Sequence, residues 1–158
     1  MKRILLTKGQ FALVDDDDFE WLNQWKWHAL TFTHTPHCRA ARGQQINGRN
    51  QIILMHRQIM GFPKMEIDHR NLNPLDNRKA NLRLSTSSQN KCNKPLGSTN
   101  SSGFKGVHLH KDKNRWMAYI TLNYKRRYLG YFDSAIEAAL AYDKASLELH
   151  GEFGRTNF

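Results

Sequence analysis

The sequence is poor in cysteine and has no long apolar segment. Its two cysteines, Cys38 and Cys92, lie far apart and form no Cys-x-x-Cys pair, which argues against a disulfide framework and against a cysteine-based zinc knuckle. No apolar run approaches the length needed to span a membrane, and the first residues, MKRILLTKGQ, lack the apolar core of a signal peptide. We therefore expect a cytoplasmic protein with free thiols and no membrane partner.

Acidic residues are also scarce. The chain has 14 Asp and Glu against 24 Lys and Arg, which gives a net charge of +10 and a pI near 9.9. Such an excess favours a polyanionic partner, although basic ribosomal-type or membrane-surface proteins share it. With 158 residues and 39% hydrophobic content, the chain allows one domain or two small ones, each with a modest core.

The most informative stretch covers residues 65–94, MEIDHRNLNPLDNRKANLRLSTSSQNKCNK. A short apolar segment ends in Asp68 and His69, and a loop rich in Asn, Asp and Pro follows it. Residues 82–86 alternate like a strand, and Thr86 or one of the two serines after it can cap a short helix. The pattern predicts strand, loop, strand and helix, in that order.

These residue types suit phosphodiester hydrolysis, which needs a base for the attacking water and a cation to neutralise the transition state. His69 is the candidate base. Asp68, and Asn90 from the predicted helix, offer oxygen ligands to a hard divalent ion. The amide of Asn81 can tie the loop to the backbone of His69. The alternative is an ordinary polar turn that carries a packed or surface histidine.

The stretch resembles the HNH family of nucleases, and most closely the phage and intron-encoded homing endonucleases. The matching elements are Asp68-His69, Asp76-Asn77-Arg78, Asn81-Leu82-Arg83 and Gln89-Asn90. The resemblance implies a ββα-metal fold, with His69 as general base and Asn81 as the structural asparagine of the catalytic set. It further implies that Asp68 and Asn90 bind one Mg²⁺ or Mn²⁺ ion per active site. The implied products carry 5′ phosphate and 3′ hydroxyl ends, and the implied setting is a bacterial or phage-infected cell.

Three arginines of this stretch, Arg70, Arg78 and Arg83, are candidates for steering the scissile phosphate of double-stranded DNA, with solvated surface charge as the alternative. One catalytic centre cuts one strand. A monomer is therefore expected to nick, and a double-strand break requires a dimer or a second binding event. No heptad pattern indicates a dimer.

The segment before this stretch predicts a small scaffold. Residues 1–14 predict a hairpin, and the acidic residues 15–18 are expected to cap a helix over residues 19–27, with a metal site as the alternative. Trp21 and Trp25, four residues apart, indicate a core, although nucleic-acid stacking is possible for such a cluster.

Further elements are predicted between this scaffold and residue 65. The expected elements are strands over 28–34, 37–42 and 51–55, a polar turn over 43–50 that contains Asn47-Gly48, and a helical run over 56–62. Arg39, Arg42 and Arg49 are interpreted as phosphate contacts or as solvated charges. Most histidines of the chain, His34 and His37 among them, are interpreted as surface or nucleic-acid contacts.

A linker over residues 95–103, rich in Gly, Ser and Asn, separates a different C-terminal pattern. Strands are predicted over 104–110, 115–122 and 126–132, followed by a helix from Ser134 to about His150-Gly151. Alternation places Trp116, Ala118, Ile120, Leu129 and Tyr131 on one face, and Tyr119, Thr121, Arg126 and Tyr128 on the other. The strands are basic and the helix is acidic, so the sheet is the face that we expect to meet DNA.

The C-terminal unit resembles the Apetala-type, or ethylene-response-factor, DNA-binding domain. The resemblance rests on Gly103-Phe104-Lys105-Gly106-Val107, on Tyr128-Leu129-Gly130-Tyr131-Phe132, on the alanine-rich helix and on Asn157-Phe158. It implies that the three-stranded sheet enters the major groove. The positions implied to contact DNA are Lys105, His108, His110, Tyr119, Thr121, Arg126 and Tyr128. Several arginines of that family are absent here, so its target sequence is not carried over. A protein-interaction module is the alternative.

Together these observations predict an α+β protein. Residues 1–94 are expected to combine N-terminal hairpins with the ββα-metal core at 65–94, residues 95–103 to form a linker, and residues 104–158 to form a three-stranded antiparallel sheet packed on one helix. The predicted function is a metal-dependent DNA endonuclease of the HNH homing type. A non-catalytic, sequence-specific DNA-binding regulator and an RNA-binding structural protein are the alternatives.

Overall fold

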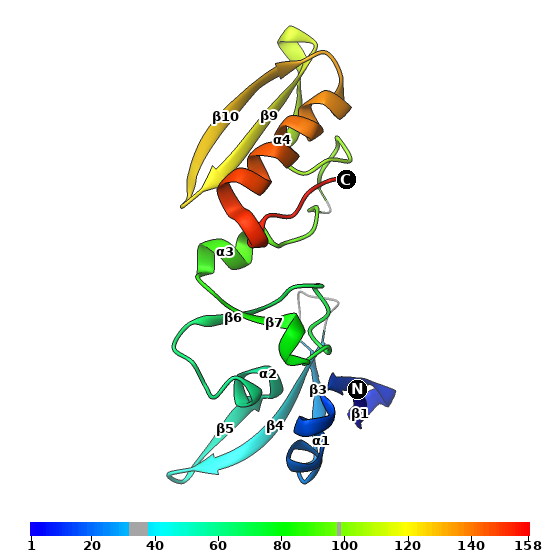
Figure 1. The fold of residues 1–158 in the computed structure, drawn as a ribbon, viewed down its shortest axis with the longest axis vertical. Coiled ribbons are helices and arrows are strands. Elements are labelled where there is room, and N and C mark those ends of the chain that lie inside the picture. Colours follow the sequence, from blue (N-terminus) through cyan, green and yellow to red (C-terminus); the bar gives the residue numbers. More distant parts are fainter. Residues whose placement is uncertain (32–37, 98) are drawn as a thin grey trace. The chain divides into compact units, whose positions relative to one another are not determined.

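The chain folds into two units, Met1–Ser85 and Thr86–Phe158, in a computed structural model that describes residues 1–31, 38–97 and 99–158. In the described residues, the first unit combines small antiparallel sheets with helices, and the second combines one antiparallel sheet with helices (Figure 1). The division at Ser85 comes before the predicted domain end at residue 94, because the helix after Ser85 contacts the C-terminal unit. Among the described residues, no helix is long and apolar enough to cross a membrane.

The first unit begins with the predicted hairpin, in which β1 (Lys2–Leu5) pairs with β2 (Phe11–Val14). Helix α1 (Asp16–Asn23) starts and ends earlier than predicted. Its first turn consists of acidic residues, whose charge is favourable at the positive end of the helix dipole. Asp15 is the N-cap residue, but its side chain makes no capping hydrogen bond; it binds a distant loop instead.

A three-stranded sheet follows, in the order β3-β4-β5, formed by β3 (His28–Thr31), β4 (Cys38–Ile46) and β5 (Arg49–Leu54). The predicted polar turn over 43–50 shortens to two residues, because Asn47 and Gly48 both adopt positive φ, 50° and 73°, as a tight hairpin turn requires. Parts of the predicted strands 28–34 and 37–42, including His34 and His37, lie outside the described residues.

The three N-terminal tryptophans belong to the core of the first unit, as the spacing of Trp21 and Trp25 predicted. Trp27 is buried with Leu22 and Met55, and Trp21 and Trp25 pack against that cluster. Arg42 corrects one prediction. Its guanidinium lies 4.4 Å from the ring centroid of Trp25 and the residue is 8% exposed, so its interpretation as a phosphate contact or a solvated charge is wrong.

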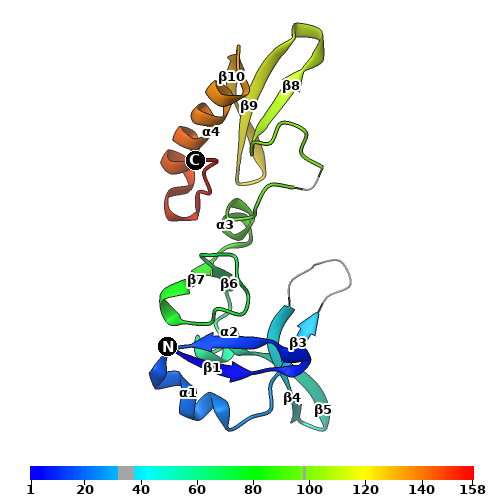
Figure 2. The same ribbon diagram turned by 90° about the vertical axis from the view of Figure 1, so that its right-hand side faces the viewer.

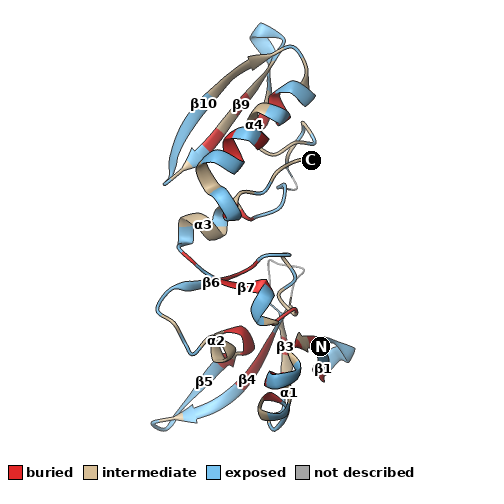
Figure 3. Ribbon diagram, in the orientation of Figure 1, coloured by how far each residue is buried: buried red, intermediate tan, exposed pale blue. Residues whose placement is uncertain are grey.

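The predicted strand-loop-strand follows helix α2 (Met55–Ile59). Strand β6 (Glu66–His69) pairs antiparallel with β7 (Leu82–Ser85), and a 3-10 turn, Lys79–Asn81, leads into β7. Buried residues lie along both strands (Figure 3). A two-stranded pair this short is marginal alone, so the loop between the strands has to be held by other contacts.

The second unit begins with α3 (Ser87–Cys92) and then forms a sheet in the order β10-β9-β8. Its strands are β8 (Val107–His110), β9 (Arg115–Leu122) and β10 (Lys125–Phe132). Helix α4 (Ala135–His150) lies across one face of this sheet (Figure 2). Three of its alanines, Ala138, Ala139 and Ala145, are buried against the sheet, and their small side chains allow close packing.

Two details of the C-terminal pattern differ from the prediction. The pairing of β10 with β9 shifts between Tyr128 and Gly130, so Tyr131 lies opposite Met117. The predicted place of Tyr131 on the helix-covered face is therefore wrong, since a bulge reverses the alternation after it. The end of the predicted linker is also structured, because the Ser102 hydroxyl bonds the main chain of Phe104 and Val107. Residue 98 of that linker lies outside the described residues.

Candidate active site and nucleic-acid interface

His69 is the last residue of β6 and is buried. Its Nε2 lies 3.3 Å from Oδ1 of Asn77, which is fully buried. The Asn77 amide nitrogen donates to the carbonyl oxygen of Leu75 at 3.3 Å and approaches the sulfur of Met55 at 3.6 Å, and these contacts turn the amide oxygen toward the imidazole. Because that oxygen can only accept, Nε2 carries the proton and Nδ1 is the basic nitrogen.

A second imidazole stands beside the first. The ring centroids of His56 and His69 are 5.2 Å apart at an interplanar angle of 77°. Burial is the largest influence on both groups: it lowers the pKa of His56 to about 3, and it lowers the pKa of His69 although the hydrogen bond to Asn77 raises it. Both rings are therefore neutral at pH 7, and a neutral imidazole is the form that can accept a proton.

Asp68 and Arg83 lie opposite each other on β6 and β7 and are both buried. The Arg83 guanidinium donates from Nε and Nη2 to Oδ2 of Asp68, at 2.8 and 2.6 Å. The ion pair neutralises a carboxylate that would otherwise be costly to bury. A cation at Asp68 would share the carboxylate with Arg83, and a phosphate would compete with Asp68 for Arg83.

Asp76 organises the loop between β6 and β7. It is 1% exposed and accepts from Nε and Nη2 of Arg78, at 2.7 and 2.6 Å, and from the Asn71 amide at 2.8 Å. The hydrogen bonds from Arg78 are the largest cause that lowers the pKa of Asp76. Arg78, which was predicted to steer a phosphate, thus makes a bidentate ion pair with Asp76.

Asn81 closes the same loop from its other end. Its side-chain oxygen accepts from the Asn71 backbone N–H at 3.0 Å, and its side-chain nitrogen donates to the carbonyl of Asp76 at 2.7 Å. The main chain of Arg70 adds a hydrogen bond to the carbonyl of Asn81 at 2.9 Å. Asn81 therefore holds the loop between β6 and β7, but its side chain bonds Asn71 and Asp76 and not, as predicted, the backbone of His69.

Contacts from the N-terminal hairpin and α1 also hold the loop. The Leu13 backbone N–H donates to the carbonyl of Leu75 at 2.8 Å, and the Asn77 backbone N–H donates to the carbonyl of Leu13 at 2.8 Å. Asp15 accepts from the Lys79 backbone at 2.8 Å, and Asp18 accepts from the Lys79 ammonium at 2.9 Å. Sequence reasoning missed this role, since the acidic run and Lys79 are more than sixty residues apart.

Asn90 is described with the second unit, on α3, and its pairing with Asp68 stays a prediction. No group of three or more His, Cys, Asp or Glu side chains in the described ranges is arranged to hold a metal. The predicted donors are instead one carboxylate and one amide oxygen. This set fits Mg²⁺, which keeps several waters and takes only one or two carboxylates beside the substrate phosphate.

The uncovered face of the C-terminal sheet carries most of the residues predicted to contact DNA. His108 and Tyr119 stack with centroids 4.9 Å apart, and the His108 Nε2 lies 2.7 Å from the Tyr119 hydroxyl. The Arg126 guanidinium lies 4.3 Å from the Tyr119 ring. Register puts Thr121 opposite Arg126 and Tyr128 opposite Tyr119, so these five residues share one face.

Tyr131 and Lys113 add to this face. The bulge adds Tyr131, whose ring contacts those of His110 and Tyr128 at 5.4 Å, and the ammonium of Lys113 lies 4.3 Å from the Tyr131 ring. Sequence alternation missed Tyr131 and gave no signal for Lys113. Lys105 differs from the other predicted contacts, because its ammonium donates to main-chain carbonyls of residues 92 and 94.

Comparisons with known proteins find two family models in different parts of the chain. A family model described as HNH endonuclease matches residues 56–92, and one described as AP2 domain matches residues 102–152. The chain is 34% identical over 89 residues to Protein 3.8 of Escherichia phage T7, which covers 56% of this chain and 73% of that protein.

Two more relatives extend the match. A protein of Acanthamoeba polyphaga mimivirus, named an uncharacterized HNH endonuclease, is 29% identical over 150 residues, which is 95% of this chain and 76% of that protein. APETALA2-like protein 2 of rice is 48% identical over 60 residues, 37% of this chain. The chain spans 14% of the length of the rice protein. The chain therefore belongs to the HNH endonuclease family and combines an HNH domain with an AP2 domain.

Proposed function

We propose that the protein is a metal-dependent endonuclease of the homing type, which hydrolyses phosphodiester bonds in double-stranded DNA and nicks one strand as a monomer. The observation that carries this proposal is the hydrogen bond between His69 and Asn77, at 3.3 Å. It fixes the tautomer of a buried, neutral imidazole, as general-base catalysis requires. The HNH family model over residues 56–92 supports the same reading.

In the proposed reaction, Nδ1 of His69 takes a proton from water while the new hydroxide attacks phosphorus. The bond to the 3′ oxygen breaks, and the leaving alkoxide takes a proton from a second water, so the products carry a 5′ phosphate and a 3′ hydroxyl. A Mg²⁺ or Mn²⁺ ion held by Asp68 and Asn90 would supply positive charge to the transition state and to the leaving oxygen. Asn77 keeps His69 in its basic tautomer, and Asn81 holds the loop that carries Asn77.

The second unit is proposed to bind duplex DNA with the uncovered sheet face. Its contacts would come from His108, His110, Tyr119, Thr121, Arg126 and Tyr128, and from Arg70 in the first unit. The support is the AP2 family model over residues 102–152 together with the cluster of rings and cations on that face. Because such binding releases counterions, affinity should fall steeply as salt rises.

Plasmid relaxation at low salt tests the proposal. Supercoiled plasmid is incubated with wild type and with His69→Ala, in Mg²⁺ or Mn²⁺ and in EDTA, and His28→Ala serves as a matched control from the same unit. Open-circle product from wild type and His28→Ala, but not from His69→Ala or in EDTA, is the expected result. Absence of cutting with retained duplex binding would favour the regulator, and nicking by His69→Ala would mean that another group is the base.

A further inference from the structure

Helix α3 is too short to be stable by itself. It has six residues, and none of them is buried, whereas isolated helices become stable only at about 12–15 residues. Its N-terminal end is fixed by a capping box: the Thr86 hydroxyl accepts from the Gln89 backbone at 3.2 Å, and the Gln89 side chain accepts from the Thr86 backbone at 2.9 Å. Its C-terminal end has to be held by other contacts.

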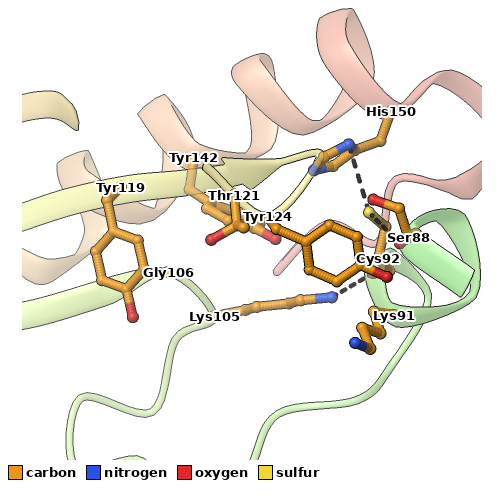
Figure 4. Close-up of a pocket in the computed structure, with 10 residues that line it drawn as sticks. All are labelled: Ser88, Lys91, Cys92, Lys105, Gly106, Tyr119, Thr121, Tyr124, Tyr142 and His150. Carbon is orange, nitrogen blue, oxygen red and sulfur yellow. Dashed lines mark hydrogen bonds between the residues drawn. The ribbon is translucent and has the colours of Figure 1, made fainter. Parts of the chain in front are cut away.

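Lys105 supplies those contacts. Its ammonium donates to the carbonyl of Cys92, the last residue of α3, and to the carbonyl of Lys94 at 2.8 Å. Carbonyls at a helix C-terminus lack partners within the helix and carry its negative dipole end, so an ammonium there is favourable. The Cys92 sulfur also lies 3.5 Å from Nδ1 of His150 on α4. Figure 4 shows the Lys105 side chain reaching the end of α3.

The backbone of Lys105 is itself fixed. The Asn157 side chain accepts from the Lys105 amide at 2.6 Å and donates to its carbonyl at 3.3 Å. Asp143 on α4 in turn holds the Asn157 amide at 2.9 Å. The next residue, Gly106, has φ +75°, and a Cβ there would lie 2.1 Å from the Tyr142 ring. The backbone that carries the Lys105 side chain is therefore held in place within the AP2 domain.

The Lys105 side chain is half-buried beside the end of α3. Its side chain borders a cavity of about 240 Å³, with walls from Tyr119, Tyr124, Tyr142 and His150 (Figure 4). Burial lowers the pKa of Lys105 to about 8, and a desolvated ammonium needs acceptors. The carbonyls of residues 92 and 94 are those acceptors.

We propose that Lys105 is a positioning residue of the nuclease. From the AP2 domain, its ammonium holds the C-terminal end of α3 and so keeps Asn90 in place as a ligand of the divalent ion. The inference rests on the proposed function, because it takes Asn90 as that ligand. It gives the AP2 domain a second proposed role beside DNA binding, which is to position a metal ligand. The lysine expected to contact DNA acts instead on the helix that completes the HNH motif.

The test uses the full chain with Lys105→Met, Lys105→Arg and the control Lys144→Met, which removes the same charge from an exposed position on α4. The hydrogen-exchange rates of the α3 backbone amides measure how firmly Lys105 holds the helix, and they do not depend on nuclease activity. Loss of free Mn²⁺ signal by electron paramagnetic resonance reports metal binding without DNA. Fluorescence anisotropy with a duplex reports DNA affinity.

For Lys105→Met we expect α3 amides to exchange at least fivefold faster and Mn²⁺ to bind about tenfold more weakly, the range seen when a residue that supports a ligand is lost. Duplex affinity should stay within about twofold of wild type. Lys105→Arg should restore part of both effects, because a guanidinium can also donate to two carbonyls, and Lys144→Met should match wild type.

A double variant separates positioning from general damage. In an Asn90→Ala background, Lys105→Met should weaken Mn²⁺ binding no further, because the two residues act on one ligand. Unchanged α3 exchange in Lys105→Met would show that Lys105 does not hold α3. Faster exchange with unchanged Mn²⁺ binding would overturn the positioning role, and lost duplex affinity alone would make Lys105 a DNA contact. If wild type binds Mn²⁺ but never cuts DNA, the proposed function fails while the positioning role of Lys105 stands.

Discussion

The two units place their polar side chains in opposite ways. Of the thirteen buried polar or charged residues among those described, ten lie in Met1–Ser85 and three in Thr86–Phe158. The first unit buries imidazoles, carboxylates, amides and guanidiniums around one loop, whereas the second covers its sheet with alanines and leaves rings and cations on the other face.

This difference matches the proposed division between catalysis in the first unit and recognition in the second. Burying polar groups costs free energy unless each finds a partner, and hydrogen bonds around His69 and Asp76 offset much of that cost in the first unit. Such hydrogen bonds fix geometry, which catalysis needs. A recognition face must stay accessible, so its residues lie where water or a nucleic acid can reach them. Variants that damage one property and spare the other test this contrast.

The largest effect is expected from Gly106→Ala, which should destabilise the second unit alone. A left-handed φ costs an alanine about 1–2 kcal/mol, and a Cβ 2.1 Å from the Tyr142 ring and 2.7 Å from the Tyr119 carbonyl forces repacking, at about 1–3 kcal/mol more. Denaturant unfolding followed by hydrogen exchange in each unit measures the change. Gly103→Ala is the control, because its φ of +77° is similar but nothing lies within 4 Å of the added carbon.

Equal losses for Gly103→Ala and Gly106→Ala would show that backbone strain, and not the contact with Tyr142, limits the second unit. A matching loss of protection in residues 1–85 would show that the two units unfold together. Either result would weaken the contrast between the units.

The next effect concerns the tautomer of His69. Asn77→Ala removes the acceptor for Nε2, so the imidazole loses both its orientation and its fixed proton. We expect the nicking rate to fall about 10- to 100-fold, as when a supporting hydrogen bond is lost at a metal or base, while duplex affinity stays within about twofold. Initial rates of plasmid nicking, with anisotropy on the same samples, make the comparison. A normal rate would mean that Asn77 does not orient the base.

The sequence predicted local features well. The Asn47-Gly48 turn and the caps at Thr86 and Ser134 are coded by residues within four positions of each other, so their chemistry can be read directly. The order of strand, loop, strand and helix around His69 came from alternation and from the HNH resemblance. These are the features that depend on neighbours in the chain.

Contacts between distant residues could not be predicted in the same way. Neither the acidic run nor Lys79 indicates its partner, although the two meet at 2.8 and 2.9 Å. Arg42 looked like a phosphate ligand because only its charge is visible in the sequence, whereas its burial depends on Trp25. The resemblance to the Apetala-type domain predicts Lys105 as a DNA contact but gives no sign that its ammonium bonds the carbonyls of residues 92 and 94. A long basic side chain can turn to either surface, and packing decides which.

A smaller effect is expected from pH, and it should appear in the first unit. The pKa of His56 is about 3 in the fold, and burial also lowers that of His69, whereas an unfolded histidine titrates near 6.5. Below that value the unfolded chain binds more protons, so the free energy of unfolding should fall as pH decreases from 6.5 toward 3, by up to about 1.4 kcal/mol per pH unit for His56.

Unfolding at pH 7, 6 and 5, followed by hydrogen exchange in residues 55–69, measures that slope. His56→Phe keeps a ring of similar size and should flatten it, leaving the part due to His69. A slope that is unchanged in His56→Phe would mean that His56 is not the group that takes up the proton.

The smallest expected effect sharpens the recognition side of the comparison. Arg126→Ala removes one cation from the sheet face, where it lies over Tyr119, and Lys144→Ala removes one from α4. We expect duplex affinity to fall about fivefold for Arg126→Ala, with the slope of log affinity against log salt reduced by about 1, since one phosphate contact is lost. Lys144→Ala should change affinity less than twofold, and neither variant should change the nicking rate at saturating DNA. If both variants lost affinity equally, net charge and not the sheet face would determine binding. The second unit would then owe its role to its charge, and the ordered rings beside Arg126 would need another explanation.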